Sequence, residues 1–239
     1  MRGSDSDALK KMAAIEAAKL VQSGQIAGLG SGSTCKFLLE ELGRRAKNGL
    51  EFFGIPTSRE TKKLAKEQGL KVLPAEKAEK IDIAIDGADE IDPELNLIKG
   101  YGGALLREKV VASKAGIFVV IADESKMVKR LGKKGILPIE ISKDSYPGII
   151  DALKDFKPAL RNVNGKPFIT DSGNFILDLN TGKTDLSYAE RRLKKTSGVL
   201  ETGLFILMAS HAIIGTKRGV MHLRPKNAHY EAINHGNVS

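Results

Sequence analysis

The most constraining feature of the sequence is the stretch from Ile81 to Lys109, IDIAIDGADEIDPELNLIKGYGGALLREK. Its first five residues, Ile81–Ile85, are apolar at four positions, which is typical of a parallel strand buried on both faces. Carboxylates follow at Asp86 and Asp89. Because ligands bind beyond the carboxyl ends of the strands in open α/β sheets, the stretch predicts a parallel sheet with a polar ligand site at that edge.

The first half of the chain alternates helical hydrophobic periods with short apolar runs, such as Ile26–Leu29 and Gly116–Ala122. Ser58 stands where a helix N-cap is expected, before a further helical period. The alternation predicts a Rossmann-like parallel sheet that is covered by helices on both faces. We expect residues 1–134 to form this catalytic domain together with residues 212–239, because an apolar strand pair from Ala212 onward returns to the sheet.

A different order follows residue 133. We expect a strand at Ile136–Ile141, a helix, two strand-like runs, a helix that begins with a capping box of Ser187 and Glu190, and one closing strand at Val199–Phe205. This β-α-β-β-α-β order is typical of a ferredoxin-like arrangement. Residues 135–211 are therefore expected to form a second, smaller α+β domain, which would serve in oligomerisation and as a lid.

A glycine-rich loop, Gly28–Thr34 (GLGSGST), lies between a predicted strand and a predicted helix. Glycines let backbone N–H groups approach an anion, and a helix N-terminus adds favourable partial charge. The loop is not a dinucleotide fingerprint, because Ser33 occupies the place of the third glycine, and it lacks the Gly-Lys-Ser/Thr of a P-loop. The alternative is that the loop is a tight strand-to-helix turn that binds no ligand. Because an acidic turn of the same predicted sheet lies beside it, we favour anion binding.

The cluster of acids admits a metal site as an alternative. An EF-hand does not fit, because Gly87 directly follows Asp86, and no histidine lies nearby to complete a transition-metal set. All four histidines lie at or after His211, so acid–base chemistry in the first domain falls to carboxylates and lysines. Glu90 and Asp92 are interpreted as loop and capping acids.

Two residues close to the glycine turn are candidates for chemistry. Glu108 is either a solvated residue of its helix or a carboxylate that the turn directs back toward Asp86. Lys99 is a candidate electrophile for developing negative charge. Cys35 lies in the first turn of a helix, where a thiol can be acidified, but no base is evident and we interpret it as a packing residue.

Composition narrows the classes of partner. The formal net charge of +9 favours anionic partners, but no RNP-like motif or arginine-rich run is present, so nucleic-acid binding is not expected. The single cysteine fits a reducing compartment, and no apolar run reaches 18 residues. We expect a cytoplasmic protein without a signal peptide that does not bind a membrane. Residues 224–239 show no hydrophobic period and are expected to form a mobile tail.

The motifs occur in the order seen in one known family. GLGSGST, IPTSRET, IDGADEID, IKGYGGALLREK, ADESK, TDSGNFILD and GVLETGLF follow one another along the chain. From about Asp7 to Leu223 the sequence resembles ribose-5-phosphate isomerase type A. The resemblance implies an aldose–ketose isomerase that interconverts D-ribose 5-phosphate and D-ribulose 5-phosphate through an enediolate. It also implies no metal or other cofactor, and a homodimer or homotetramer.

The resemblance also implies roles for individual residues. The family's acid–base glutamate falls on Glu108, its lysine before the glycine turn falls on Lys99, and its paired aspartates, one of which opens the furanose ring, fall on Asp86 and Asp89. The implied contacts with the sugar phosphate are Ser31, Gly32, Ser33, Thr34, Asp86, Gly87, Ala88, Asp89, Lys99, Gly100, Tyr101, Gly102 and Lys126.

Three positions depart from the family pattern. Ser31 replaces a threonine and keeps a hydroxyl, and Leu106 replaces a common threonine. Tyr101 stands where many members have glycine, so its side chain either points away from the sugar or narrows the pocket.

Three alternative functions remain from the sequence: another sugar-phosphate isomerase, an amino-sugar-phosphate deaminase, or the sugar-phosphate sensor domain of a transcription regulator.

Overall fold

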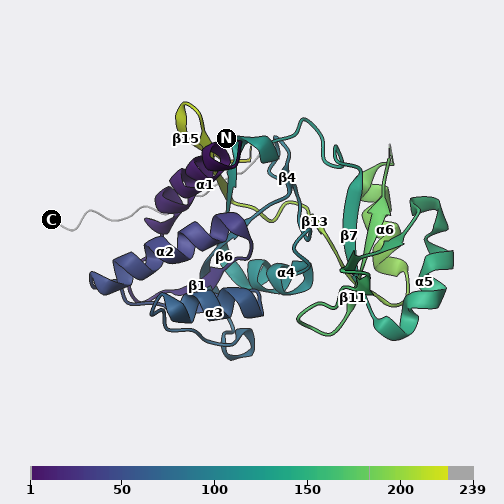
Figure 1. Ribbon diagram of the computed structural model, residues 1–239, viewed down its shortest axis with the longest axis horizontal. Coiled ribbons are helices and arrows are strands. Elements are labelled where there is room, and N and C mark those ends of the chain that lie inside the picture. Colours follow the sequence, from purple (N-terminus) through teal and green to yellow (C-terminus); the bar gives the residue numbers. More distant parts are fainter. Residues whose placement is uncertain (1, 183, 226–239) are drawn as a thin grey trace.

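The computed structural model describes residues 2–182 and 184–225, and Figure 1 shows them arranged around a large sheet and a smaller one. The large sheet has the strand order β15-β14-β6-β3-β1-β2, in which every neighbouring pair is parallel except β14 with β15. Its strands are β1 (Ile26–Leu29), β2 (Phe53–Pro56), β3 (Ile81–Gly87), β6 (Ala115–Asp123), β14 (His211–Thr216) and β15 (Gly219–Leu223). The α/β class predicted from the sequence is confirmed.

Helices cover both faces of the large sheet (Figure 1). On one face, α1 (Arg2–Ala18) and α2 (Ser33–Lys47) pack closely, because α1 presents a stripe of fully buried alanines: Ala13, Ala14, Ala17 and Ala18. The opposite face is covered by α4 (Leu105–Lys114) through Val111 and Ala112. The helix α3 (Arg59–Glu67) begins as predicted, with the Ser58 hydroxyl accepting a bond from the Thr61 N–H at 3.0 Å.

The smaller sheet is antiparallel and has the strand order β12-β7-β11-β8. Its elements along the chain are β7 (Ile136–Ile141), α5 (Tyr146–Ala152), β8 (Ala159–Leu160), β11 (Phe175–Asn180), α6 (Leu186–Lys195) and β12 (Val199–Thr202). A two-stranded hairpin of β9 (Asn162–Val163) and β10 (Lys166–Pro167) is inserted before β11. This order is the ferredoxin-like one that the sequence predicted.

Two details of the smaller sheet differ from the prediction. The N-cap of α6 is Asp185, whose carboxylate accepts the Tyr188 N–H at 2.9 Å, so Ser187 lies inside the helix and the predicted capping box is wrong. The predicted strand Val199–Phe205 is broken at Gly203, which accepts a bond from the Lys99 N–H and donates to the Pro138 carbonyl. A side chain there would collide with the Lys99 carbonyl, so the break follows from close packing.

The residues after this break join a third, three-stranded sheet with the order β13-β5-β4. Its strands are β4 (Glu90–Ile91), β5 (Leu97–Ile98) and β13 (Leu204–Phe205). This sheet connects the two larger ones and positions the residue that follows β5, Lys99. Residues 226–239, most of the predicted tail, lie outside the described part of the chain. Within the described part, no helix combines the length and the apolarity needed to cross a bilayer.

Candidate active site

A cavity of about 110 Å³ lies beyond the carboxyl ends of β1, β3 and β6, where the sequence predicted a site. The cavity is surrounded by the loop after β1, the loop after β3, the glycine turn at residues 100–103, the first turn of α4 and the short helix Glu124–Lys126 that follows β6. The lining residues are Ser31, Gly32, Ser33, Thr34, Gly87, Ala88, Asp89, Lys99, Gly100, Gly102, Glu108 and Lys126. Every predicted site residue except Asp86 and Tyr101 lines this cavity, and Asp86 lies behind the wall in contact with Lys99.

Three buried charges form the centre of this site. The Lys99 ammonium lies 3.2 Å from Asp86 Oδ2 and 3.4 Å from Glu108 Oε2. All three residues are at most 7% exposed, so the charges interact with little screening by water. Lys99 also donates to the Gly87 carbonyl. Two carboxylates and one ammonium carry an uncompensated negative charge when all are ionised, so the cluster favours binding one more proton or cation.

The environment tunes the proton affinities of this cluster. Burial raises the pKa of Glu108 to about 8, with a further contribution from the negative charge of Asp86. Burial alone would lower the pKa of Lys99, but Asp86 and Glu108 outweigh it and the pKa is raised above its ordinary value. Lys99 is therefore a permanent cation, whereas Glu108 exchanges a proton near neutral pH. Glu108 Oε2 has no hydrogen-bond partner among the described residues, although it lies within ion-pair distance of Lys99.

Asp86 is held by several donors that converge on its other oxygen. Oδ1 accepts the N–H groups of Ser31, at 3.0 Å, and Gly87, at 2.7 Å, and the Cys35 thiol lies 3.6 Å away. Burial, together with the nearby Asp86 charge, raises the pKa of Cys35 well above its ordinary value, so it remains a thiol donor. A Cβ at Gly30 would lie 2.2 Å from Asp86 Oδ1, so this glycine is required for the close approach.

The loop Ser31–Thr34 is supported from behind by hydroxyl groups. Ser31 Oγ lies 2.7 Å from Thr57 Oγ1 and 3.1 Å from Thr61 Oγ1, and Thr61 in turn donates to the Gly30 carbonyl. Gly32 adopts a φ of +92°, which favours glycine, and no side chain caps α2 there. The uncapped N–H groups at the start of α2 thus remain available to an anion, and the Lys126 side chain lines the same cavity.

Asp89 and Tyr101 are joined through the backbone. Asp89 Oδ2 accepts the Tyr101 N–H at 3.0 Å, which fixes the carboxylate at the cavity wall. The Tyr101 side chain points away from the cavity, into the core of the smaller sheet, with its hydroxyl 3.5 Å from the Ile136 carbonyl. It is therefore not a side-chain contact of the site and does not narrow the cavity.

Other residues have functions that the sequence did not reveal. Glu90, interpreted as a loop acid, is fully buried in β4 and accepts the N–H groups of residues 132–134, at 2.7, 3.2 and 2.7 Å. Asp92 is a loop acid as expected, since its carboxylate accepts the N–H groups of Glu94 and Asn96.

The threonines that support the glycine-rich loop, Thr57 and Thr61, lie in the IPTSRET motif. The sequence alone did not reveal them, because a network of hydroxyl groups between distant segments leaves no periodic signal. Among the described residues, no group of three or more His, Cys, Asp or Glu side chains is arranged to hold a metal ion.

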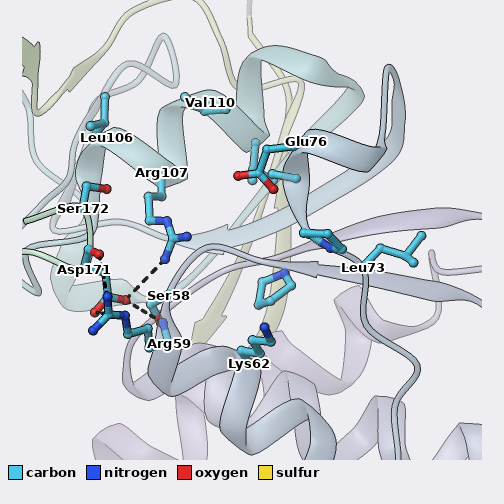
Figure 2. Close-up of a pocket in the computed structure, with 14 residues that line it drawn as sticks. Ser58, Arg59, Lys62, Leu73, Glu76, Leu106, Arg107, Val110, Asp171 and Ser172 are labelled. Atoms are coloured by element: carbon cyan, nitrogen blue, oxygen red, sulfur yellow. Dashed lines mark hydrogen bonds and ion pairs between the residues drawn. The ribbon is translucent and has the colours of Figure 1, made fainter.

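A larger cavity of about 480 Å³ lies on the other side of α4, and the sequence assigned nothing to it. Figure 2 shows Asp171, from the loop before β11, between two arginines in the wall of this cavity. Asp171 Oδ2 accepts the backbone N–H of Arg59 at 2.6 Å and lies 3.7 Å from Arg107 Nη1. The loop of the smaller sheet is thus attached to α3 and to α4, the helix that carries Glu108.

Comparison with known proteins agrees with this geometry. The family model described as Ribose 5-phosphate isomerase A (phosphoriboisomerase A) matches residues 53–219. Relatives named ribose-5-phosphate isomerase A include one from Deinococcus radiodurans, 46% identical over 92% of this chain and 99% of the relative, and one from Methanothermobacter thermautotrophicus, 45% identical over 90% and 97%.

Solved structures of similar proteins indicate the same family. A ribose 5-phosphate isomerase from Plasmodium falciparum superimposes with a TM-score of 0.87 at 42% identity, covering 92% of this chain and 99% of the other. A D-ribose-5-phosphate isomerase in complex with phospho-erythronic acid also gives a TM-score of 0.87, at 40% identity and the same coverage. With these matches over nearly the whole chain, and with the acidic and glycine-rich motifs gathered at one cavity, the protein belongs to the ribose-5-phosphate isomerase A family.

Proposed function

We propose that this chain interconverts D-ribose 5-phosphate and D-ribulose 5-phosphate through an enediolate, with Glu108 as the acid–base group. The observation that carries the proposal is the buried cluster of Asp86, Lys99 and Glu108 at the wall of a small polar cavity. Family membership supports the reaction, and the complex of a solved relative with phospho-erythronic acid supports a phosphorylated sugar-like ligand.

The chemical step requires one base that serves both carbons. Ionised Glu108 removes the proton from C2 of the open-chain aldose, and the C–H electron pair forms the C1=C2 bond while negative charge moves to O1. The same carboxyl group then delivers the proton to C1, and the hydroxyl proton passes from O2 to O1, which gives the ketose. A base with a pKa near the working pH is the most effective for such a shuttle, which contributes roughly 10²–10⁴ in rate.

Lys99 stabilises the enediolate. Its pKa is raised by its two carboxylate neighbours, so it stays cationic throughout the reaction, and its burial strengthens its attraction for developing negative charge. Asp86 holds the Lys99 ammonium in place through their ion pair and neutralises part of its positive charge. Because Asp89 lines the cavity whereas Asp86 lies behind the wall and is bonded to other groups, we assign opening of the furanose ring to Asp89.

The phosphate group is assigned to the opposite end of the cavity. The uncapped N–H groups at the start of α2, the hydroxyls of Ser33 and Thr34, and the Lys126 ammonium supply donors and positive charge there. Binding energy from the phosphate orients C1 and C2 toward Glu108, which places the reacting carbon beside its base.

The wider setting is also part of the proposal. We propose that residues 135–211 form a second domain that covers the cavity and serves in oligomerisation, and that the protein is a cytoplasmic homodimer or homotetramer. The contacts of Asp171 with Arg59 and Arg107 support the covering role. The single cysteine, which is buried, fits a reducing compartment.

A coupled assay on ribose 5-phosphate, with and without EDTA, tests the proposal. We expect formation of ribulose 5-phosphate at the same rate in both conditions, and slower or undetectable conversion of hexose phosphates and amino-sugar phosphates. A folded protein that leaves ribose 5-phosphate unchanged, or that prefers an amino-sugar phosphate, would refute it.

A further inference from the structure

An arginine of the smaller sheet reaches the glycine turn of the active site. Arg161 directly follows β8, and its side chain is 13% exposed. Its Nη1 group donates to two successive carbonyls, those of Gly100 at 2.7 Å and Tyr101 at 3.0 Å. The rest of the guanidinium faces Asp178, with Nε 2.9 Å from Oδ2 and Nη2 bonded to Oδ1. Asp178 therefore fixes the plane of the guanidinium by a two-point contact.

These two bonds, together with the bond from the Gly103 N–H to the Gly100 carbonyl at 2.9 Å, determine where the N–H groups of the turn point. In a trans peptide the N–H is directed opposite to the C=O. Because Arg161 holds the Gly100 carbonyl, the N–H of Tyr101 points to the other side, where it donates to Asp89 at 3.0 Å. Because Arg161 also holds the Tyr101 carbonyl, the N–H of Gly102 points away from the guanidinium as well. Gly102 lines the catalytic cavity, and its N–H has no partner in the part of the chain that the structure describes.

Further contacts hold the same segment in place. Phe168 packs so closely against Gly103 that a Cβ at Gly103 would lie 2.3 Å from its ring. Asp171 then bonds to the N-terminus of α3 and lies beside Arg107 in α4, as Figure 2 shows. The segment 161–171 is thus attached to the glycine turn, to α3 and to α4, so the position of Arg161 relative to the cavity is well defined.

We propose that Arg161, held by Asp178, is a positioning residue of the isomerase that orients the peptides of residues 100–102. In this arrangement the Gly102 N–H faces the enediolate oxygens as a second donor beside Lys99, and the Tyr101 N–H holds Asp89 for ring opening. The proposal rests on the proposed function. It makes the smaller sheet a contributor to the active site, because without Arg161 the Tyr101 carbonyl loses its hydrogen-bond partner and the Gly100 carbonyl keeps only the Gly103 N–H, so the peptides of the turn are held less firmly.

The test compares Arg161→Ala and Asp178→Asn with Arg192→Ala as the matched control. Arg192 makes the same kinds of contact in the same part of the protein, with Nη2 2.9 Å from the Ala152 carbonyl and Nη1 3.1 Å from Asp155, but it does not approach the cavity. Steady-state kcat and KM for ribose 5-phosphate, thermal unfolding and circular dichroism are measured for each variant. The activity is then measured again with added guanidinium at concentrations far below those that unfold the protein, with sodium chloride as the ionic control.

We expect Arg161→Ala to lower kcat roughly 10- to 100-fold, since small errors of position at a reacting centre cost up to about that factor. The KM should change much less, because the phosphate contacts of Ser31–Thr34 and Lys126 remain. Asp178→Asn should give an intermediate loss of kcat. Added guanidinium should restore part of the activity of Arg161→Ala, and should not raise that of Arg192→Ala.

Wild-type turnover in the same assay separates this proposal from the proposed function. If the wild type is active and folded Arg161→Ala keeps its kcat, the positioning role is refuted while the isomerase assignment stands. Equal losses in Arg161→Ala and Arg192→Ala, without rescue by guanidinium, would show a general effect of destabilising the smaller sheet and would also refute it. An inactive wild type would overturn the proposed function, and with it the role of Arg161.

Discussion

Replacing Lys99 by methionine removes the only cation within ion-pair distance of Asp86 and Glu108 among the described residues, at nearly constant volume. At the observed separations, each charge pair is worth about 5 kcal/mol with an effective dielectric constant of about 20. Desolvation offsets much of this, and breaking a buried pair typically costs about 3–5 kcal/mol. Because 1 kcal/mol shifts the Tm of a chain of this size by about 2–4 °C, we expect the Tm to fall by roughly 10 °C.

The same substitution should have a characteristic pH dependence. The folded-state pKa of Glu108, about 8, lies above its unfolded value, so this group lowers the stability of the wild type as the pH rises from the unfolded value to about 8. In Lys99→Met no ammonium favours the ionised carboxylate, so its pKa rises further and the loss of stability continues above pH 8. The loss of Tm relative to wild type should therefore be larger at pH 9 than at pH 6, where Glu108 keeps its proton and only Asp86 is left without its cation.

The substitution should also remove most of the activity, because the enediolate loses its charged partner. Loss of one such stabilising donor lowers kcat by roughly 10²–10³. Lys109→Met is the matched control: Lys109 forms a partly buried ion pair with Glu201 at 2.8 Å and packs over the same Phe205 ring as Lys99, but it does not reach the cavity. Thermal unfolding and the coupled assay should show a lower Tm with nearly normal kcat for Lys109→Met. Normal kcat and Tm in Lys99→Met would refute the electrostatic account.

Four further predictions follow from the site. The kcat/KM should rise about tenfold per pH unit and level off near the Glu108 pKa of about 8, and levelling near the ordinary value of 4.5 would contradict Glu108 as the titrating base. Gly30→Ala should abolish activity because its Cβ collides with Asp86, whereas a kcat near that of wild type would show that the loop moves freely. Tyr101→Gly should keep the KM for ribose 5-phosphate and lower the Tm, since its side chain packs away from the cavity; a changed KM would place the ring in the site. Lys126→Met should raise the KM far more than it lowers kcat, and the reverse would argue against a phosphate contact.

The sequence predicted the elements that obey a local rule. The apolar run Ile81–Ile85 forms part of the buried parallel strand β3, and Ser58 caps its helix, because hydrophobic period and capping chemistry are properties of neighbouring residues. Asp89 and the loop Ser31–Thr34 reach one cavity because they follow β3 and β1, neighbouring strands of the parallel sheet, a consequence of topology that holds without knowledge of side-chain positions. The glycine turn follows β5 of the three-stranded sheet, so this rule does not account for its place at the cavity.

The sequence did not predict features that depend on distant segments. Glu90 is fully buried because residues 132–134 supply three N–H groups from another loop. The strand predicted up to Phe205 breaks at Gly203 because Lys99 and Pro138 pack against it from two sides. The contact of Arg161 with the glycine turn joins residues about 60 positions apart, and no periodicity encodes such a pairing.

The central claim is that Glu108 moves the proton between C2 and C1, and proton exchange with solvent in Glu108→Gln tests it most directly. In D₂O, the wild type should exchange the C2 proton of ribose 5-phosphate, as followed by proton NMR. Glu108→Gln keeps the size of the side chain but cannot accept a proton, so it should bind the sugar phosphate and show neither exchange nor turnover. Exchange of the C2 proton by folded Glu108→Gln at the wild-type rate would contradict the account.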